Sequence, residues 1–320
     1  MPDLNVGGQA VIEGVMMRSR DRIATAVRVP SGEILVKTEE YKSLASRHKV
    51  LNIPVLRGAV AFVEMLVIGI RTLNFSADIA VKEAEKEEAV RKGQQIAAPK
   101  QNALYLGLTA VFALTLGIGV FFLVPLAITD VLNIRKEAVE FNLVAGAIRL
   151  TMFVAYVWVI SLFGEFKRIF QYHGAEHKSI YAYEMGDDLV PERVARHTRF
   201  HPRCGTSFIL IVALLAVIVY AISDTLYAVW TGHPPTLFTR FGIHFALLPV
   251  VAGTSFELLK LSGKTRDNVV TRLLIAPGLW LQKITTKEPS REQLEVGIVA
   301  LEAALGVTES RLECRRTPVS

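Results

Sequence analysis

Residues 173–178 read HGAEHK, which places two histidines four positions apart with a glutamate directly before the second. On a helix, residues four apart share a face, so His173 and His177 can bind one metal ion together. Glu176 lies one turn from His173, where a carboxylate can act as an acid or a base. The spelling H-x-x-E-H also matches the inverted zincin pattern. The stretch therefore predicts a metal site or an acid–base pair.

A second group of ligand types follows in the segment RHTRFHPRCG, which carries His197, His201 and Cys204. Pro202 disfavours helical geometry at the residue before it, so this group comes from a turn. Four of the seven histidines and one of the two cysteines then fall within residues 173–204. Imidazole and thiolate together suit zinc. We predict zinc, or another divalent metal, as the cofactor, with these ligands: His173, His177, His201 and Cys204.

The number of ligands decides what such a metal can do. With four ligands the coordination shell is closed and the ion is structural. With three, one position stays open and Glu176 becomes the candidate catalytic base. Asp187 and Asp188 are additional candidate ligands or bases. A structural polar cluster without metal is the alternative, because a basic, histidine-containing loop near a membrane also binds anionic lipid.

The elements that position these residues are mostly membrane helices. About half of the 320 residues are hydrophobic, and no charged residue occurs from Gln101 to Thr129. A helix needs roughly 20 apolar residues to cross a bilayer. We predict an α-helical integral membrane protein with about four transmembrane helices, at 103–129, 141–163, 207–230 and 240–259. Pro249 and Gly253 predict a kink in the last of these.

The second span is expected to continue into the cytoplasm as one helix. A stripe of residues in this stretch advances in steps of four and three, which is the spacing of one helix face. The stripe consists of Phe166, Phe170, His173, His177, Ile180 and Glu184.

Residues 1–50 are expected to form a small β-rich cytoplasmic domain. RIATAVRV, PSGE and ILVKT read as strand, turn and strand. Gly7, Gly8 and Gly14 permit turns or close backbone approach in this sheet. No GK[ST] follows them, so a phosphate-binding loop is not supported.

Residues 51–102 are expected to form an interfacial or re-entrant helix and a charged linker. Arg57 and Glu64 are seven residues apart in the apolar stretch 53–70, hence on one helix face. Lone charges in hydrocarbon are costly, so both side chains should face protein or headgroups. Residues 78–100 are rich in charge, which is typical of a solvated helix and linker.

The remaining boundaries are a membrane domain at 103–260, with its His/Cys loop at 164–206, and an amphipathic cytoplasmic tail at 261–320. Residues 268–286 suit an interfacial helix interrupted at Pro277 and Gly278. SREQ at 290–293 is a capping box that should open a soluble amphipathic helix over 290–305.

Basic residues predict the orientation of the chain in the bilayer. The only lysine and arginine residues of the 130–140 loop are Arg135 and Lys136, and the 231–239 loop contains neither lysine nor arginine. The 164–206 loop contains Lys167, Arg168, Lys178, Arg193, Arg196, Arg199 and Arg203. Both termini and this loop are therefore expected to be cytoplasmic. Orientation also accounts for the net charge of +6, so no nucleic-acid partner is predicted. Sparse cysteines suit a reducing compartment. We expect no cleavable signal in the opening MPDLNVGGQA, because it lacks a basic segment followed by a long apolar one.

Four motifs in order, GGQAVIEGVMMR, HGAEHK, HPRCGTSF and APGLWLQKITTKEP, resemble the YqhQ family of bacterial multi-pass membrane proteins. The resemblance spans nearly the whole chain. It implies a place in the bacterial cytoplasmic membrane and a functional role for His173, Glu176, His177, His201 and Cys204. The family is a domain of unknown function, sometimes labelled a predicted metal-dependent enzyme. The resemblance names no substrate.

Two functions follow from these expectations. The first is a membrane-bound metal-dependent enzyme, expected to be a hydrolase at the cytoplasmic membrane face, with arginines of the 164–206 loop steering an anionic group. The second is a non-catalytic membrane scaffold or assembly factor with a structural metal or a polar histidine cluster. The expected partners are the lipid bilayer, anionic lipid or another membrane protein. Arg149 and Asp224 are intramembrane charges that a transporter would also carry.

Overall fold

Four antiparallel strands form the amino-terminal sheet in the computed structural model, which describes residues 6–92, 103–133, 139–264 and 268–307. The strands are β1 (Gly7–Val11), β2 (Gly14–Arg18), β3 (Arg22–Arg28) and β4 (Ile34–Glu40), and they lie side by side in chain order. The register of β3 on β4 pairs Arg22 with Glu40 and Arg28 with Ile34. The strand–turn–strand prediction for this segment is therefore confirmed.

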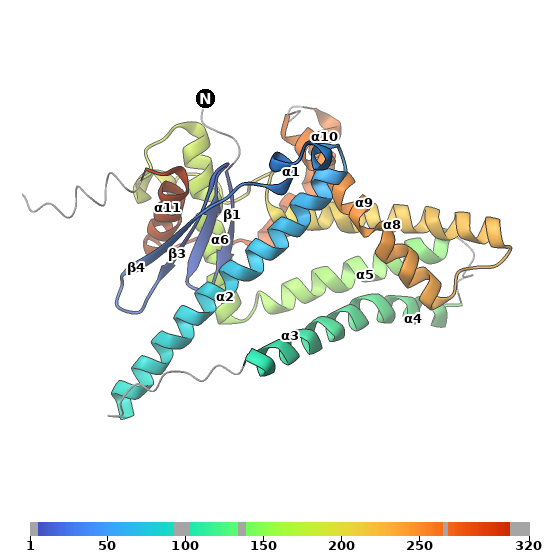
Figure 1. Cartoon of the computed structure of the whole chain (residues 1–320), viewed down its shortest axis with the longest axis horizontal. Coiled ribbons are helices and arrows are strands. Elements are labelled where there is room, and N and C mark those ends of the chain that lie inside the picture. Colours follow the sequence, from blue (N-terminus) through green and yellow to red (C-terminus); the bar gives the residue numbers. More distant parts are fainter. Residues whose placement is uncertain (1–5, 93–102, 134–138, 265–267, 308–320) are drawn as a thin grey trace, which may run out of the picture.

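The sheet is covered by helices on both faces (Figure 1). Successive side chains of a strand point to opposite faces, and both sets here are apolar. One face packs Val15, Met17, Ala24 and Ala26 against α6 (Gly164–Met185) and α11 (Arg291–Leu305). The other packs Val11, Met16, Ile23 and Val27 against α2 (Leu56–Lys92). The sheet thus shares its core with helices from the middle and the end of the chain.

Four helical segments are long and apolar enough to cross a bilayer: Val111–Val131, Val139–Ile160, Gly205–Thr231 and Leu237–Leu261. They lie in α3 (Ala103–Ile118) with α4 (Val124–Val131), in α5 (Val139–Ile160), in α8 (Gly205–Thr231) and in α9 (Leu237–Lys264). A π-helical turn, Gly119–Leu123, joins α3 to α4. It comes just before Pro125, whose missing N–H interrupts the regular bonding. The four segments indicate a membrane protein, as the sequence predicts.

The prediction of one continuous helix from the second span into HGAEHK is wrong. Helix α5 ends at Ile160, and α6 begins at Gly164 and runs in another direction (Figure 1). Backbone N–H groups of Ser161, Leu162 and Phe163 bond three residues back and tighten the last turn. Phe163 is then extended, with ψ at 137°. Within α6, the two histidines nevertheless lie on one helix face, as the stripe predicts.

The apolar stretch 53–70 and the charged segment 78–100 are not separate elements, because α2 runs through both as far as Lys92 as one helix of 37 residues. Residues 93–100 of the charged segment lie outside the described residues. Arg57 forms an ion pair with Glu257 of α9. Glu64 accepts hydrogen bonds from the Tyr41 hydroxyl at 2.9 Å and the backbone N–H of Leu44 at 2.6 Å. Both charges therefore face protein, as predicted, although each has its own partner.

Helices α2 and α9 approach closely where two glycines meet. A Cβ on Gly58 would lie 2.7 Å from the backbone oxygen of Gly253, and a Cβ on Gly253 would lie 2.1 Å from the backbone oxygen of Val55. Helix α9 runs through Pro249 as a single helix. The start of α2 is thus fixed against the apolar bundle.

The predicted interruption at Pro277–Gly278 is also wrong, since α10 (Val269–Thr285) is one helix through both residues. Gly278 packs against α8, where a Cβ would lie 2.4 Å from the Ser207 hydroxyl. Tertiary packing therefore holds the helix across its proline. The capping box is confirmed: Ser290 and Gln293 cap the start of α11 reciprocally. Short helices α1 (Leu44–Arg47) and α7 (Pro191–Val194) and a 3-10 turn (Lys49–Asn52) complete the described elements.

Candidate metal centre

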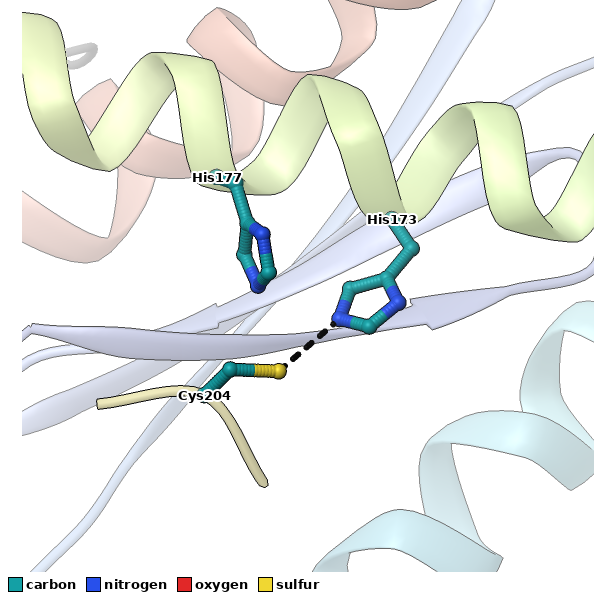
Figure 2. Close-up of side chains that lie close together, drawn as sticks. All are labelled: His173, His177 and Cys204. Atoms are coloured by element: carbon teal, nitrogen blue, oxygen red, sulfur yellow. Dashed lines mark hydrogen bonds between the residues drawn. The ribbon is translucent and has the colours of Figure 1, made fainter. Parts of the chain in front are cut away.

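Three predicted ligands converge at the junction between the sheet module and the apolar bundle. Helix α6 carries His173 and His177 on one face, and Cys204 lies opposite them at the start of α8 (Figure 2). One ligand atom from each residue lies within 4.8 Å of the other two. His173 Nε2 is 3.2 Å from Cys204 Sγ. This set, two imidazoles and one thiol, is suited to zinc.

Backbone carbonyls fix the orientation of both imidazole rings. His173 Nδ1 is 2.8 Å from the oxygen of Thr285, and His177 Nδ1 is 2.5 Å from the oxygen of Arg199. A carbonyl only accepts, so each Nδ1 carries a hydrogen and donates it. The two Nε2 atoms are left to face Cys204. Metal-binding histidines are oriented by the same kind of contact.

His177 Nε2 is buried and has no hydrogen-bond partner among the described residues. His177 as a whole is 1% exposed. An unsatisfied buried polar atom costs roughly 1–3 kcal/mol. A cation held between His177, His173 and Cys204 would satisfy this atom, so the residues present fit a metal ion.

The Cys204 sulfur is stabilised as a thiolate. Burial raises the pKa of the thiol, but the adjacent His177 and His173 outweigh burial and hold this pKa well below its usual range. Cys204 also caps the start of α8, and its sulfur lies 3.4 Å from the backbone nitrogen of Thr206. Helix starts favour negative charge. A thiolate is the form that binds metal.

Glu176 lies beside the three ligands without belonging to the group. Its carboxylate is 3.9 Å from His173 Nε2 and is 6% exposed. Burial raises the pKa of Glu176, while His177 and His173 act in the opposite direction. Burial would lower the pKa of His173, but Cys204 and Glu176 raise it to about 9. These directions describe an imidazolium–thiolate pair, whose proton a divalent cation would displace.

Gly8 on β1 packs against the side chain of Glu176. The backbone of Gly8 hydrogen bonds to the Glu176 carboxylate. A Cβ at this position would lie 2.9 Å from Glu176 Cγ. One glycine of the amino-terminal motif therefore permits close backbone approach to the site. The GGQA stretch was the available sequence signal, but its target could not be identified without the fold.

His201 lies next to the group of three and makes other contacts. Its ring centroid is 5.8 Å from that of His177, and its Nε2 is 3.4 Å from Glu184 Oε1. The backbone N–H of His201 donates to Gln282 Oε1 at 2.8 Å. The structure thus places His201 between the three ligands and α10, at the edge of the site.

The other candidates of the 164–206 loop lie outside the group. Asp187 accepts from His197 Nε2 at 2.7 Å, and Asp188 pairs with Arg193 at 3.4 Å. The loop arginines also have acidic partners: Arg199 pairs with Glu288 and Arg203 with Glu184. These ion pairs neutralise much of the positive charge that would steer an anionic group.

Two supporting residues were missed by sequence reasoning. Thr285 orients His173 through its carbonyl, which no side-chain pattern signals. Gly174 lets α6 meet the chain after α10, because a Cβ there would lie 2.1 Å from the oxygen of Lys287. The glycine inside HGAEHK was the available signal for this second contact.

A separate polar cluster lies at the other end of the bundle. Asp224 of α8 contacts two residues of α9, Arg240 at 2.6 Å and His244 at 3.0 Å, and all three are buried. Arg149 of α5 donates to the oxygen of Phe121 at 3.0 Å, within the π-helical turn. The two intramembrane charges noted in the sequence are therefore both bound by protein groups.

Comparison with known proteins agrees with the sequence motifs. A family model described as "Protein of unknown function (DUF1385)" matches residues 53–307. A protein of Bacillus subtilis (strain 168), "Uncharacterized protein YqhQ", is 35% identical over 303 residues, which cover 91% of this chain and 89% of that protein. No solved structure matches the chain.

Proposed function

The chain belongs to the DUF1385 family, and from its site geometry we propose that it is a membrane-bound, metal-dependent hydrolase acting at the cytoplasmic face of the bilayer. The observation that carries this proposal is the convergence of two oriented imidazoles and one thiol, with a buried carboxylate beside them. Three ligands leave a coordination position open, which is typical of catalytic zinc sites.

Each residue of the site has a distinct role in this proposal. His173, His177 and Cys204 would hold the ion, which when bound supplies Lewis acidity. Glu176 takes a proton from the attacking water and returns it to the leaving group. Thr285 and Arg199 keep the imidazoles in the tautomer that presents Nε2. Gly8 donates its hydrogen bond to Glu176 and keeps the carboxylate close to the ligands.

The substrate class follows from the position of the site. Cys204 directly precedes α8, and Thr285 ends α10, which packs on α8. The site therefore lies at the end of the apolar bundle. A lipid-linked molecule or a segment of a membrane protein would reach it from the bilayer surface.

One observation favours a second candidate, a structural metal in a membrane scaffold. His177, Glu176 and Cys204 are all buried, at 1%, 5% and 6% exposure. If Glu176 completes the coordination shell, the ion would hold α6 to the start of α8 and would have no open position.

Glu176→Gln separates the two functions. The wild-type protein, purified at full length, is expected to contain about one zinc ion per chain by elemental mass spectrometry. A glutamine cannot act as a base, so the variant should keep its zinc and its unfolding temperature. It should lose roughly a hundredfold or more of the hydrolysis rate, measured in proteoliposomes with fluorogenic ester, phosphoester and peptide probes.

Glu165→Gln, an exposed change in the first turn of the same helix, is the matched control and should alter neither readout. Loss of zinc from Glu176→Gln would show that Glu176 is a ligand of a closed shell. That outcome contradicts the hydrolase and supports the scaffold.

The orientation of the chain is part of the proposal, and the excess of basic residues in 164–206 supports it. Thr236→Cys and Asp188→Cys, each in a Cys314→Ser background, place one exposed thiol on either side. In intact cells, an impermeant maleimide is expected to label position 236, and position 188 only after permeabilisation. Labelling of 188 from outside, with none at 236, would reverse the orientation.

A further inference from the structure

A groove of about 510 Å³ lies between α2 and the end of β4, on the face of the sheet away from the metal centre. Its size falls within the range of roughly 300–1,000 Å³ that small-molecule sites occupy. The lining is mainly apolar. It includes Ile23, Leu44, Ala59, Val60, Val63 and Val67.

The groove continues an apolar strip on the outside of α2. Val63, Val67 and Ile70 are 57%, 52% and 61% exposed. Their spacing of four and three residues places them on one helix face. An exposed, contiguous apolar strip marks an interaction surface. A helix face exposed only to water would carry polar residues.

The position of α2 identifies the surface that this strip meets. The same helix begins against the bundle, where Gly58 packs on Gly253 and Arg57 pairs with Glu257 of α9. Helix α9 is long and apolar enough to cross a bilayer. The strip on α2 therefore continues from the apolar bundle towards the sheet, so a bilayer around the bundle would also reach the strip.

Three charged residues of the lining, Glu39, Glu40 and Arg71, lie together where β4 ends against α2. Arg71 is 65% exposed on its side chain and lies 3.6 Å from Glu39. A guanidinium matches a phosphate, and the carboxylates match an ammonium group. This end therefore suits a headgroup that carries both charges.

We propose that the groove binds one acyl chain of a bilayer phospholipid with a zwitterionic, amine-bearing headgroup. The chain lies along Ala59, Val60 and Val63. The phosphate meets Arg71, and the ammonium group meets Glu40, because Glu39 already pairs with Lys37 at 2.6 Å. This site is separate from the metal centre and does not depend on the proposed hydrolase.

Native mass spectrometry of the full-length protein in detergent tests the site. Delipidated protein is titrated with phosphatidylethanolamine, and bound lipid is counted. One lipid adduct should saturate first on the wild type. Ala59→Trp and Val63→Trp fill the groove and should each weaken this adduct about tenfold. Val81→Trp, at an exposed position later on the same helix, is the control and should leave it unchanged.

The headgroup is tested separately from the chain. Arg71→Gln should weaken binding of phosphatidylethanolamine about tenfold but leave binding of diacylglycerol, which lacks the phosphate, unchanged. A phospholipid with a photoreactive acyl chain should crosslink within residues 41–72. Equal lipid retention by wild type and both tryptophan variants, or crosslinks spread evenly over the apolar helices, would overturn the proposal.

Discussion

Replacing His177 with alanine is expected to reduce bound zinc from about one ion per chain to none. His177 supplies one of three ligand atoms, and its Nε2 is buried with no hydrogen-bond partner among the described residues. A ligand that binds only the folded state stabilises it by about 4 kcal/mol at a thousand times its Kd. Added zinc should therefore raise the unfolding temperature of the wild type and leave that of the variant unchanged. Elemental analysis and thermal unfolding with and without a chelator measure both effects.

His197→Ala is the matched control, because His197 bonds to Asp187 and lies outside the group of three. This variant should keep its zinc. A full zinc complement in His177→Ala would show that the ion binds elsewhere. Wild-type protein that stays free of zinc, even when refilled with the metal, would leave only the polar histidine cluster.

Replacing Asp224 with asparagine is expected to destabilise the folded bundle by about 3–5 kcal/mol, as measured by denaturant unfolding in detergent. Asp224 neutralises Arg240, and both side chains are buried, at 3% and 5% exposure. Asparagine still accepts the hydrogen bond from His244 but leaves the guanidinium uncompensated. The cost arises from that unpaired buried charge.

The double variant Asp224→Asn with Arg240→Met distinguishes this cause from a packing defect. Removing the guanidinium as well should recover most of the lost stability, since replacing both partners of a buried pair is often nearly neutral. A double variant as unstable as the single one would contradict the charge explanation.

Local sequence signals predicted several elements of this fold correctly. The four apolar segments are recognisable because a bilayer demands length and hydropathy within one stretch of chain. The β3–β4 hairpin and the capping box at Ser290 are equally local, since turn and cap residues lie beside the backbone that they shape.

Two of the wrong predictions, the continuous helix into HGAEHK and the interruption at Pro277, concern helix boundaries that tertiary packing decides. The stripe from Phe166 to Glu184 is a valid helix face, but it carries no information about the break at 161–163. Pro277 would normally interrupt a helix, yet Gly278 against Ser207 holds α10 intact. Contacts between segments far apart in the chain determine both outcomes.

The candidate site divides in the same way. The spacing of His173 and His177 predicts their common face, and the structure adds Cys204 from the predicted turn. Pro202 indicates that the chain turns at His201 but does not say which way its imidazole points. The position of His201 near Glu184 depends on how α6, the turn and α10 pack, which no local motif encodes.

The hydrogen bonds from His173 and His177 to two backbone carbonyls have a consequence for the whole molecule. Thr285 is 112 residues from His173, and Arg199 is 22 residues from His177. Coupling free energies are reciprocal. If the positions of these segments strengthen ion binding, a bound ion stabilises those positions by the same free energy. The end of α10 and the turn before α8 should therefore loosen when the ion is withdrawn. Hydrogen exchange at the end of α10, which contributes none of the three ligands, would then report the occupancy of the site.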